Sequence, residues 1–441
     1  MKHIAKHLTS VAMCFLFAHA SIAQIYHTES NKVVVGQIGD IVWEPGVHNN
    51  YDAQFGTLIA KENRNSNTSR KIGIPVICTE PASRPNQGLP VFVLGGGPGE
   101  SNLSNTLFFE KIAQFHPTIM VGYRGVDGSS RLNCDYLLNA LCDKKLTYEN
   151  ARNTFKAAID SCMEDWARKL IDIKGYTMQE VVNDIEDVRK SLNYDKIQIV
   201  AFSYGTMLAQ LYAQQYPEHI DKNVLIAPRL LFDFDIHTSD VADLDSRINE
   251  VLAPRSPYII KRCISAYDSI DQSSSNKEIY MLFTYSNLYS TEGINTLMQL
   301  MAQGETGNWN PLESALGKFS TSFSAKMALG DIIAKKQNGT ILNTQRRNVP
   351  EYAPLSIGVN HWFNPYEYQY IKPTKITANH IPTLIICGNL DIVSSPSVVV
   401  RQIAETYKES TSTIIGNCGH TDLLSTQRDT TESAIAKFLD K

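Results

Sequence analysis

Hydrophobic and polar positions along this chain predict two stretches in which strands and helices alternate. Residues 33–76 alternate in polarity between turn signals, which is typical of antiparallel strands. Short apolar runs with the length of buried strands follow, separated by helical patterns, at residues 90–94, 118–122, 197–200 and 223–227. Such alternation predicts right-handed crossovers and a mostly parallel sheet flanked by helices, which is an α/β fold.

The alternation stops between about residues 229 and 378, where helices and loops rich in aromatic residues are expected. It resumes with an apolar strand at 381–386 and continues to a last helix at 430–439. A sheet interrupted in this way predicts a core with an inserted helical cap. The expected division is a core over 24–228 and 379–441, with the cap over 229–378 between its two parts.

Residues 1–23 have the pattern of an export signal. A basic start is followed by an apolar stretch from Val11 to Ala20, and small residues at 21 and 23 fit cleavage before Gln24, with 18 and 20 as the alternative pair. The apolar stretch is shorter than the ~20 residues that a membrane-spanning helix needs, and no later segment is long and apolar enough to span. We therefore expect an exported protein, periplasmic or extracellular, without a transmembrane segment after signal removal.

Charge argues against nucleic acid as a partner. The 441 residues carry 41 Lys and Arg against 45 Asp and Glu, a formal net charge of −4, and no basic stripe is present.

Cysteine usage allows disulfides in an oxidising compartment. Of the eight cysteines, Cys14 lies in the signal, so an odd number remains in the mature chain. Cys134, Cys142 and Cys162 lie close enough in sequence to staple an excursion from the core, and Cys387 with Cys418 is a second candidate pair. A buried free thiol is the alternative for each. No spacing resembles a zinc site, so neither a metal nor an organic cofactor is expected.

One serine stands where a strand passes directly into a helix. The apolar run 197–202 ends at Ser203, and Tyr204-Gly205-Thr206 opens a helical pattern. Such a sharp turn exposes a hydroxyl and aims the N–H groups of the first helical turn at developing negative charge. Ser203 is therefore the candidate nucleophile, against the alternative of an ordinary helix-capping serine.

Three further features supply what a nucleophilic serine needs. The glycine loop Leu94 to Ser101 follows an early core strand, so the backbone N–H groups of Gly96 and Gly97 could form an oxyanion hole with that of Tyr204. Asp391 follows the resumed strand, where a carboxylate can orient an imidazole, and His420 lies in the loop after the last strand. The order Ser, Asp, His along the chain is that of the α/β-hydrolase triad.

Together these residues resemble the prolyl aminopeptidase and tripeptidyl aminopeptidase family of α/β-hydrolases. Gly95-Gly96-Gly97-Pro98-Gly99 is similar to the family's His-Gly-Gly-Pro-Gly loop, with glycine replacing histidine. Gly122 to Ser129 resembles its Asp-x-Arg-Gly-x-Gly-x-Ser turn, with departures at Gly122 and Asp127. Val200 to Thr206 resembles its nucleophile elbow, with Ala201 departing. The resemblance covers about 33–229 and 381–439 and does not extend far into the cap.

This resemblance implies hydrolysis of an amide at the N-terminus of a peptide, with carboxylates that hold the substrate ammonium. Glu100, beside the glycine loop, is a candidate for that contact, against a plain solvated loop carboxylate. The cap adds glutamates without a distinguishing pattern, at Glu292, Glu305, Glu313, Glu351 and Glu367. Arg124 is expected to brace the glycine loop.

Two alternatives stay open. A carboxylesterase or lipase-like enzyme would use the same machinery on a small ester, and a non-catalytic binding protein could occupy the same fold. Paired acids in the cap would favour the peptidase, whereas loss of contact between Asp391 and His420 would favour the binding protein.

Overall fold

The computed structural model of the chain describes residues 36–81, 88–141, 148–252, 258–269, 276–319, 325–341, 347–367, 370–371, 377, 379–393 and 395–440. The expected signal segment 1–23 lies outside these residues. Among them, no helix is long and apolar enough to cross a membrane.

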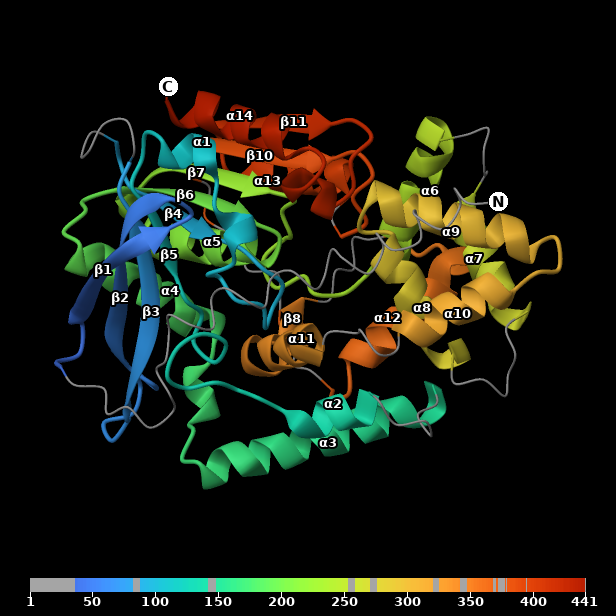
Figure 1. Cartoon of the computed structure of the whole chain (residues 1–441), viewed down its shortest axis with the longest axis horizontal. Coiled ribbons are helices and arrows are strands. Elements are labelled where there is room, and N and C mark those ends of the chain that lie inside the picture. The colour runs from blue at the N-terminus through green and yellow to red at the C-terminus, as the bar shows by residue number, and fades with distance from the viewer. Residues whose placement is uncertain are drawn as a thin grey trace, which may run out of the picture.

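Nine strands of the described residues form one sheet in the order β1-β2-β3-β5-β4-β6-β7-β10-β11 (Figure 1). The strands β1, β2, β3 and β5 pair antiparallel, and every pair from β5 through β4, β6, β7 and β10 to β11 is parallel. Their bounds are β1 (Ile41–His48), β2 (Tyr51–Lys61), β3 (Lys71–Thr79), β4 (Val91–Leu94), β5 (Thr118–Val121), β6 (Ile197–Phe202), β7 (Ile220–Ile226), β10 (Thr383–Gly388) and β11 (Ser410–Ile415). The expected α/β architecture is confirmed.

Helices cover both faces of this sheet, because successive strand residues point to opposite sides. Phe92 and Leu94 of β4 pack with α4 (Met178–Ser191), α5 (Tyr204–Gln215) and α13 (Pro396–Thr406). Val91 and Val93 pack on the other face with α1 (Glu110–Ala113) and α14 (Arg428–Leu439). Figure 1 shows α1 and α14 on one side of the strands and α4 and α5 on the other.

The long insertion forms a separate group of helices beside the carboxyl ends of the parallel strands (Figure 1). It contains α6 (Thr238–Leu252), α7 (Ile259–Ala266), α8 (Asn276–Asn287), α9 (Thr291–Gly304), α10 (Asn310–Phe319), α11 (Ala325–Asn338) and α12 (Ala353–Phe363). A two-stranded sheet of β8 (Thr340–Ile341) and β9 (Tyr370–Ile371) is also present, which the sequence pattern did not predict. Short 3₁₀ turns lie at Asn105–Leu107, Ile173–Gly175, Pro217–His219, Tyr267–Ser269, Pro350–Tyr352 and Thr421–Leu424.

Two helices from the first core segment pack with the cap helices rather than with the sheet. The helices α2 (Asp135–Leu141) and α3 (Tyr148–Arg168) share one buried apolar cluster with α6 to α12, and α3 contacts α12. A disulfide joins Cys134 to Cys162 across this excursion. The domain boundaries stay a prediction, but the cap-side layer includes residues well upstream of 229.

The second candidate cysteine pair is not bonded, and the alternative of buried free thiols is confirmed for both residues. Cys387 and Cys418 are both buried free thiols. Cys387 lies within β10 and Cys418 lies in the loop that follows β11, and each packs among apolar side chains. The third cysteine of the first cluster, Cys142, lies outside the described residues.

Candidate active site

Ser203 lies at a strained turn between β6 and α5. Its φ of 51° is in the left-handed region, which non-glycine residues adopt rarely and at a cost. The turn is held because the Ser203 N–H donates to Ile226 O (3.0 Å), and the Thr206 N–H donates to Ser203 O (2.9 Å). A Cβ on Gly205 would lie 2.3 Å from Leu94 O, so only glycine lets α5 start against the end of β4.

The structure brings the three predicted triad residues into contact. His420 Nε2 lies 2.8 Å from Ser203 Oγ, and His420 Nδ1 lies 2.8 Å from Asp391 Oδ2. The Asp391 side chain is fully buried, and its Oδ1 accepts the Val393 N–H at 2.8 Å. With the imidazole proton on Nδ1, Asp391 accepts it and Nε2 is free to accept the serine proton.

Two aromatic rings contact the imidazole. The ring of Phe202, from β6, has its centroid 5.1 Å from that of His420. The ring of Tyr289, from the cap, meets His420 edge to face at 5.4 Å. The candidate base is therefore packed by one side chain from the core and one from the cap.

The glycine loop begins directly beside the elbow, and Gly96 takes a positive φ of 79°. Gly95, the first glycine of the loop, is fixed at both polar backbone atoms: its N–H donates to Asn102 Oδ1 (2.8 Å), and its O accepts from the Tyr123 hydroxyl (3.0 Å). Asn102 also donates from its amide to Val93 O (2.9 Å) and Val121 O (2.8 Å), which joins the loop to two parallel strands.

Asp127, a departure from the family pattern, braces this loop. Its carboxylate accepts the hydroxyl of Ser101 (2.6 Å) and the N–H groups of Asn102 (3.2 Å) and Tyr123 (2.8 Å). Burial raises the pKa of Asp127, against the effect of these hydrogen bonds. No role could be assigned to Asp127 from the sequence pattern, because only the tertiary structure places its carboxylate beside the loop.

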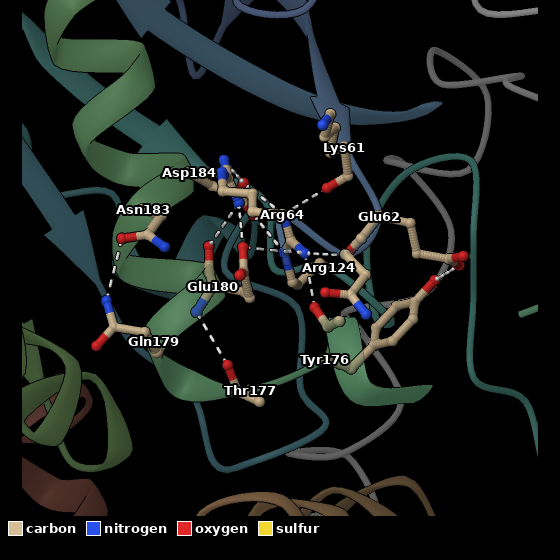
Figure 2. Close-up of polar contacts among 12 residues, drawn as sticks. Lys61, Glu62, Arg64, Arg124, Tyr176, Thr177, Gln179, Glu180, Asn183 and Asp184 are labelled. Carbon is tan, nitrogen blue, oxygen red and sulfur yellow. Dashed lines mark hydrogen bonds and ion pairs between the residues drawn. The ribbon is translucent and has the colours of Figure 1, made fainter. Parts of the chain in front are cut away.

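The expected role of Arg124 is wrong. Figure 2 shows its guanidinium among α4 and the chain after β2. It donates to both oxygens of Asp184 (2.6 and 2.7 Å) and to the backbone oxygens of Glu62 (2.7 Å) and Gly175 (2.6 Å). Arg124 thus fastens the antiparallel strands to α4, and Arg64, which pairs with Glu180 and Asp184, extends the same network (Figure 2).

The cap helix α11 is seated on the glycine loop. A Cβ on Gly330 would lie 2.1 Å from the carbonyl carbon of Pro98, and one on Gly97 would lie 3.2 Å from Met327. This contact brings Asp331 close to the elbow. Burial raises the pKa of Tyr204, and the charge of Asp331 raises it further.

A buried lysine accompanies Asp331. Lys335 Nζ lies 2.8 Å from Asp331 Oδ2 and 3.7 Å from Asp235 Oδ1, and it donates to Asn364 Oδ1 (2.9 Å). The sequence pattern did not single out Asp331, because an acidic and a basic residue four positions apart are common on helices. Asp235 is far from Lys335 in sequence, so no spacing links the two. Glu305, one of the cap glutamates that the sequence suggested, pairs instead with Arg262 at 2.7 Å at an exposed position.

Glu100 is half-buried, and its N–H donates to Gly97 O (3.1 Å), which closes the glycine loop. Its substrate role stays a prediction. Among the residues that the structure describes, no group of three or more His, Cys, Asp or Glu could hold a metal ion.

Comparison with known proteins agrees with this topology. A family described as alpha/beta hydrolase fold matches residues 90–249. The chain is 22% identical over 419 residues to a putative hydrolase, YuaR, of Escherichia coli strain K12, covering 81% of this chain and 79% of that protein. A match of 38% identity to epoxide hydrolase 1 of Caenorhabditis elegans covers only 15% of this chain and 16% of that protein.

Solved structures with similar chains share low sequence identity. A proline iminopeptidase of Mycobacterium smegmatis is 15% identical, with a TM-score of 0.44 over 84% of this chain and 95% of that one. A meta-cleavage product hydrolase of Pseudomonas fluorescens is also 15% identical, with a TM-score of 0.42 over 84% of this chain and 94% of that one. The parallel sheet with its strand–elbow–helix unit and the family match over 90–249 show that the chain has the α/β-hydrolase fold.

Proposed function

We propose that the chain is an exported serine hydrolase that cleaves an acyl bond through Ser203, His420 and Asp391. The observation that carries this proposal is the pair of 2.8 Å contacts from His420, one to Ser203 Oγ and one to Asp391 Oδ2. The Cys134–Cys162 disulfide supports export, because such bonds persist in oxidising compartments.

In the proposed mechanism, Ser203 Oγ attacks the substrate carbonyl while His420 Nε2 takes its proton. Asp391 holds the imidazole orientation and stabilises the imidazolium. The tetrahedral oxyanion accepts hydrogen bonds from the backbone N–H of Tyr204 and from those of the Gly96–Gly97 region. His420 then gives the proton to the leaving group, and water, activated by the same imidazole, releases the acyl-enzyme.

We further propose that the substrate is a peptide with a free N-terminus and that the enzyme is an aminopeptidase. The resemblance of the glycine loop and the elbow to the prolyl aminopeptidase family supports this, and so does Asp331, which follows Gly330 where α11 contacts the glycine loop. The side chain of Asp331 is 15% exposed, so it can reach a ligand while it remains paired with Lys335. A carboxylate at this place can accept hydrogen bonds from a substrate ammonium.

The first test is labelling of the mature protein with a fluorophosphonate probe. Wild type should label, and Ser203→Ala should not, because the probe reacts only with an activated serine. Absence of labelling in folded wild type would contradict the catalytic proposal and favour a binding protein on this fold.

The second test separates peptidase from esterase. Wild type should hydrolyse aminoacyl and short peptidyl anilides with free amino groups faster than their N-acetyl counterparts. Asp331→Asn should lower kcat/KM for the free amines by about 10- to 100-fold, the range for a lost charge-assisted hydrogen bond, and leave N-acetyl substrates unchanged. Glu305→Gln, which alters a cap acid at the surface, is the matched control. Preference for p-nitrophenyl esters with no effect of Asp331→Asn would favour the esterase.

A further inference from the structure

The loop that carries His420 is bound to the cap as well as to the core. We propose that the cap turn Tyr289–Thr291 and Arg247 of α6 are positioning elements of the triad, with Asp422 as the residue that joins this turn to the His420 loop. This inference rests on the proposed function, because it assigns these residues to holding the proposed base and its carboxylate partner. It makes the cap part of the catalytic geometry as well as a cover for the substrate.

Asp422 joins the two parts through a single oxygen. Its Oδ2 accepts the N–H of Gly419, next to His420, at 2.8 Å, and the N–H of Thr291, at the start of α9, at 2.9 Å. The residue is 2% exposed, so water does not compete freely for these bonds. A displacement of the α8–α9 turn would therefore act directly on the residue that precedes the base.

The backbone of the cap turn adds a second connection. Tyr289 O accepts the Thr421 N–H (2.9 Å) and the Thr421 hydroxyl (3.2 Å). A Cβ on Gly419 would lie 2.8 Å from Tyr289 O, so glycine is needed for the loop and the turn to approach this closely. The cap turn thus hydrogen-bonds Thr421 directly and reaches Gly419 through Asp422, and its Tyr289 ring also contacts the imidazole at 5.4 Å.

The Asp391 loop is also bound to the cap, through Arg247. Its guanidinium donates to Asn389 O and to Asp391 O, the latter at 3.3 Å. Asn389 in turn accepts the Cys418 N–H at its side-chain oxygen (3.2 Å), which links the loops of the carboxylate and the base. His420 and Asp391 therefore both lie on loops that are hydrogen-bonded to the cap.

Geometry explains why such support should affect the reaction. Proton transfer from Ser203 needs the imidazole within hydrogen-bond distance of Ser203 Oγ and Asp391 Oδ2. A misplacement of the imidazole by about 1 Å can lower the rate about 100-fold. Because the bonds hold the loops that carry His420 and Asp391 and do not contact substrate, their loss should lower kcat and the labelling rate more than it raises KM.

The experiment compares Asp422→Ala with Asp422→Asn, and adds Arg247→Ala as a second, independent variant. Two readouts are used: the rate of fluorophosphonate labelling, and the downfield proton NMR resonance of the imidazole N–H shared with a carboxylate. Asp422→Ala should label about 100-fold more slowly and lose or broaden the resonance. Asp422→Asn keeps an accepting oxygen and should recover most of both. Arg247→Ala should slow labelling as well.

The matched control is Asp245→Ala. Asp245 is also a buried cap carboxylate that accepts two backbone N–H groups, from Ile260 (2.9 Å) and Lys261 (3.2 Å), but it joins α6 to α7 inside the cap. Loss of the Asp245 carboxylate should lower the melting temperature but change neither the labelling rate nor the imidazole resonance. The contacts between the cap and the loops of His420 and Asp391 do not involve this carboxylate.

Wild-type labelling rates and resonances in both Asp422→Ala and Arg247→Ala would overturn the inference while leaving the proposed function standing. Failure of wild type to label would instead contradict the function. The resonance would then still report whether Asp422 positions the imidazole, because it does not depend on turnover.

Discussion

Ser203 adopts a backbone conformation that typically costs about 1–3 kcal/mol, and its neighbours hold it in that conformation. Hydrogen bonds from the Ser203 and Thr206 N–H groups fix the turn, while Gly205 leaves space for the end of β4. The methyl of Ala201, where the family has glycine, is fully buried and tolerated. This elbow therefore requires glycine two residues after the serine, at Gly205, but accepts alanine two residues before it, at Ala201.

Asp127 is the residue at which the site departs most from expectation, and it can be tested alone. Asp127→Ala leaves the N–H groups of Asn102 and Tyr123 without their acceptor, so unfolding free energy should fall by about 1–3 kcal/mol. Labelling of Ser203 should slow because the glycine loop loses its brace. Urea unfolding and probe kinetics measure the two effects. Asp135→Ala, at an exposed carboxylate nearby, is the control, and equal behaviour of the two variants would refute the role of Asp127.

Among the elements, α11 and the α2–α3 excursion support the glycine loop, and the sequence pattern did not indicate this role for either. The helix α11 contacts the glycine loop through Gly330, and α2 contacts α11 in turn. An excursion from the core thus supports the helix that carries Asp331. Its own anchor is the disulfide between Cys134 and Cys162, which closes a loop of 28 residues.

Removal of that disulfide should destabilise the excursion. For a loop of this length, chain entropy predicts a loss of roughly 3–4 kcal/mol in unfolding free energy for Cys134→Ser with Cys162→Ser. Denaturant unfolding of the double variant against wild type measures the loss. Cys263→Ser, at a buried free thiol of the cap, controls for the change of side chain. A double variant as stable as wild type would show that the excursion does not need the bond.

At the scale of the whole molecule, buried ion pairs join the antiparallel part of the sheet to the helices that pack on it. Arg64 and Arg124 fasten the antiparallel strands to α4 (Figure 2). Further along α4, Glu186 accepts from Arg189 (2.8 Å) and from the Tyr212 hydroxyl of α5 (2.7 Å). Protonation of the Glu186 carboxylate would weaken its pairing, so Glu186 contributes to the acid limit of stability.

Glu186 gives that limit a specific pH window. Burial opposes its charge, but hydrogen bonds from Arg189 and Tyr212 outweigh burial and lower its pKa from 4.5 to about 2. A depressed carboxyl pKa contributes stability above the unfolded-state pKa, and this contribution is lost as pH falls through the folded-state value. The stability difference between wild type and Glu186→Gln should therefore be constant above about pH 5 and shrink towards pH 2. Thermal melts across this range measure it; Glu44→Gln, an exposed site, should show no such trend, and a constant difference for Glu186→Gln would contradict the prediction.

The sequence by itself determined the alternation of strands and helices in the core, the elbow at Ser203 and the loops on which Asp391 and His420 lie. These features are local: apolar periodicity, a strand that runs into a helix, and loops that follow buried strands. Meeting of the three residues also followed from topology, because parallel strands end at the same edge of the sheet.

Only the tertiary structure decided what surrounds them. Asp127 contacts Ser101 and Asn102, and Asp422 contacts Thr291, across long separations in sequence, and no periodicity marks such contacts. For the same reason the pairing of Arg124 with Asp184, the packing of α2 and α3 on the cap, and the free thiols at Cys387 and Cys418 could not be read from spacing. Local patterns specify elements, whereas the environment of a side chain depends on which elements pack together.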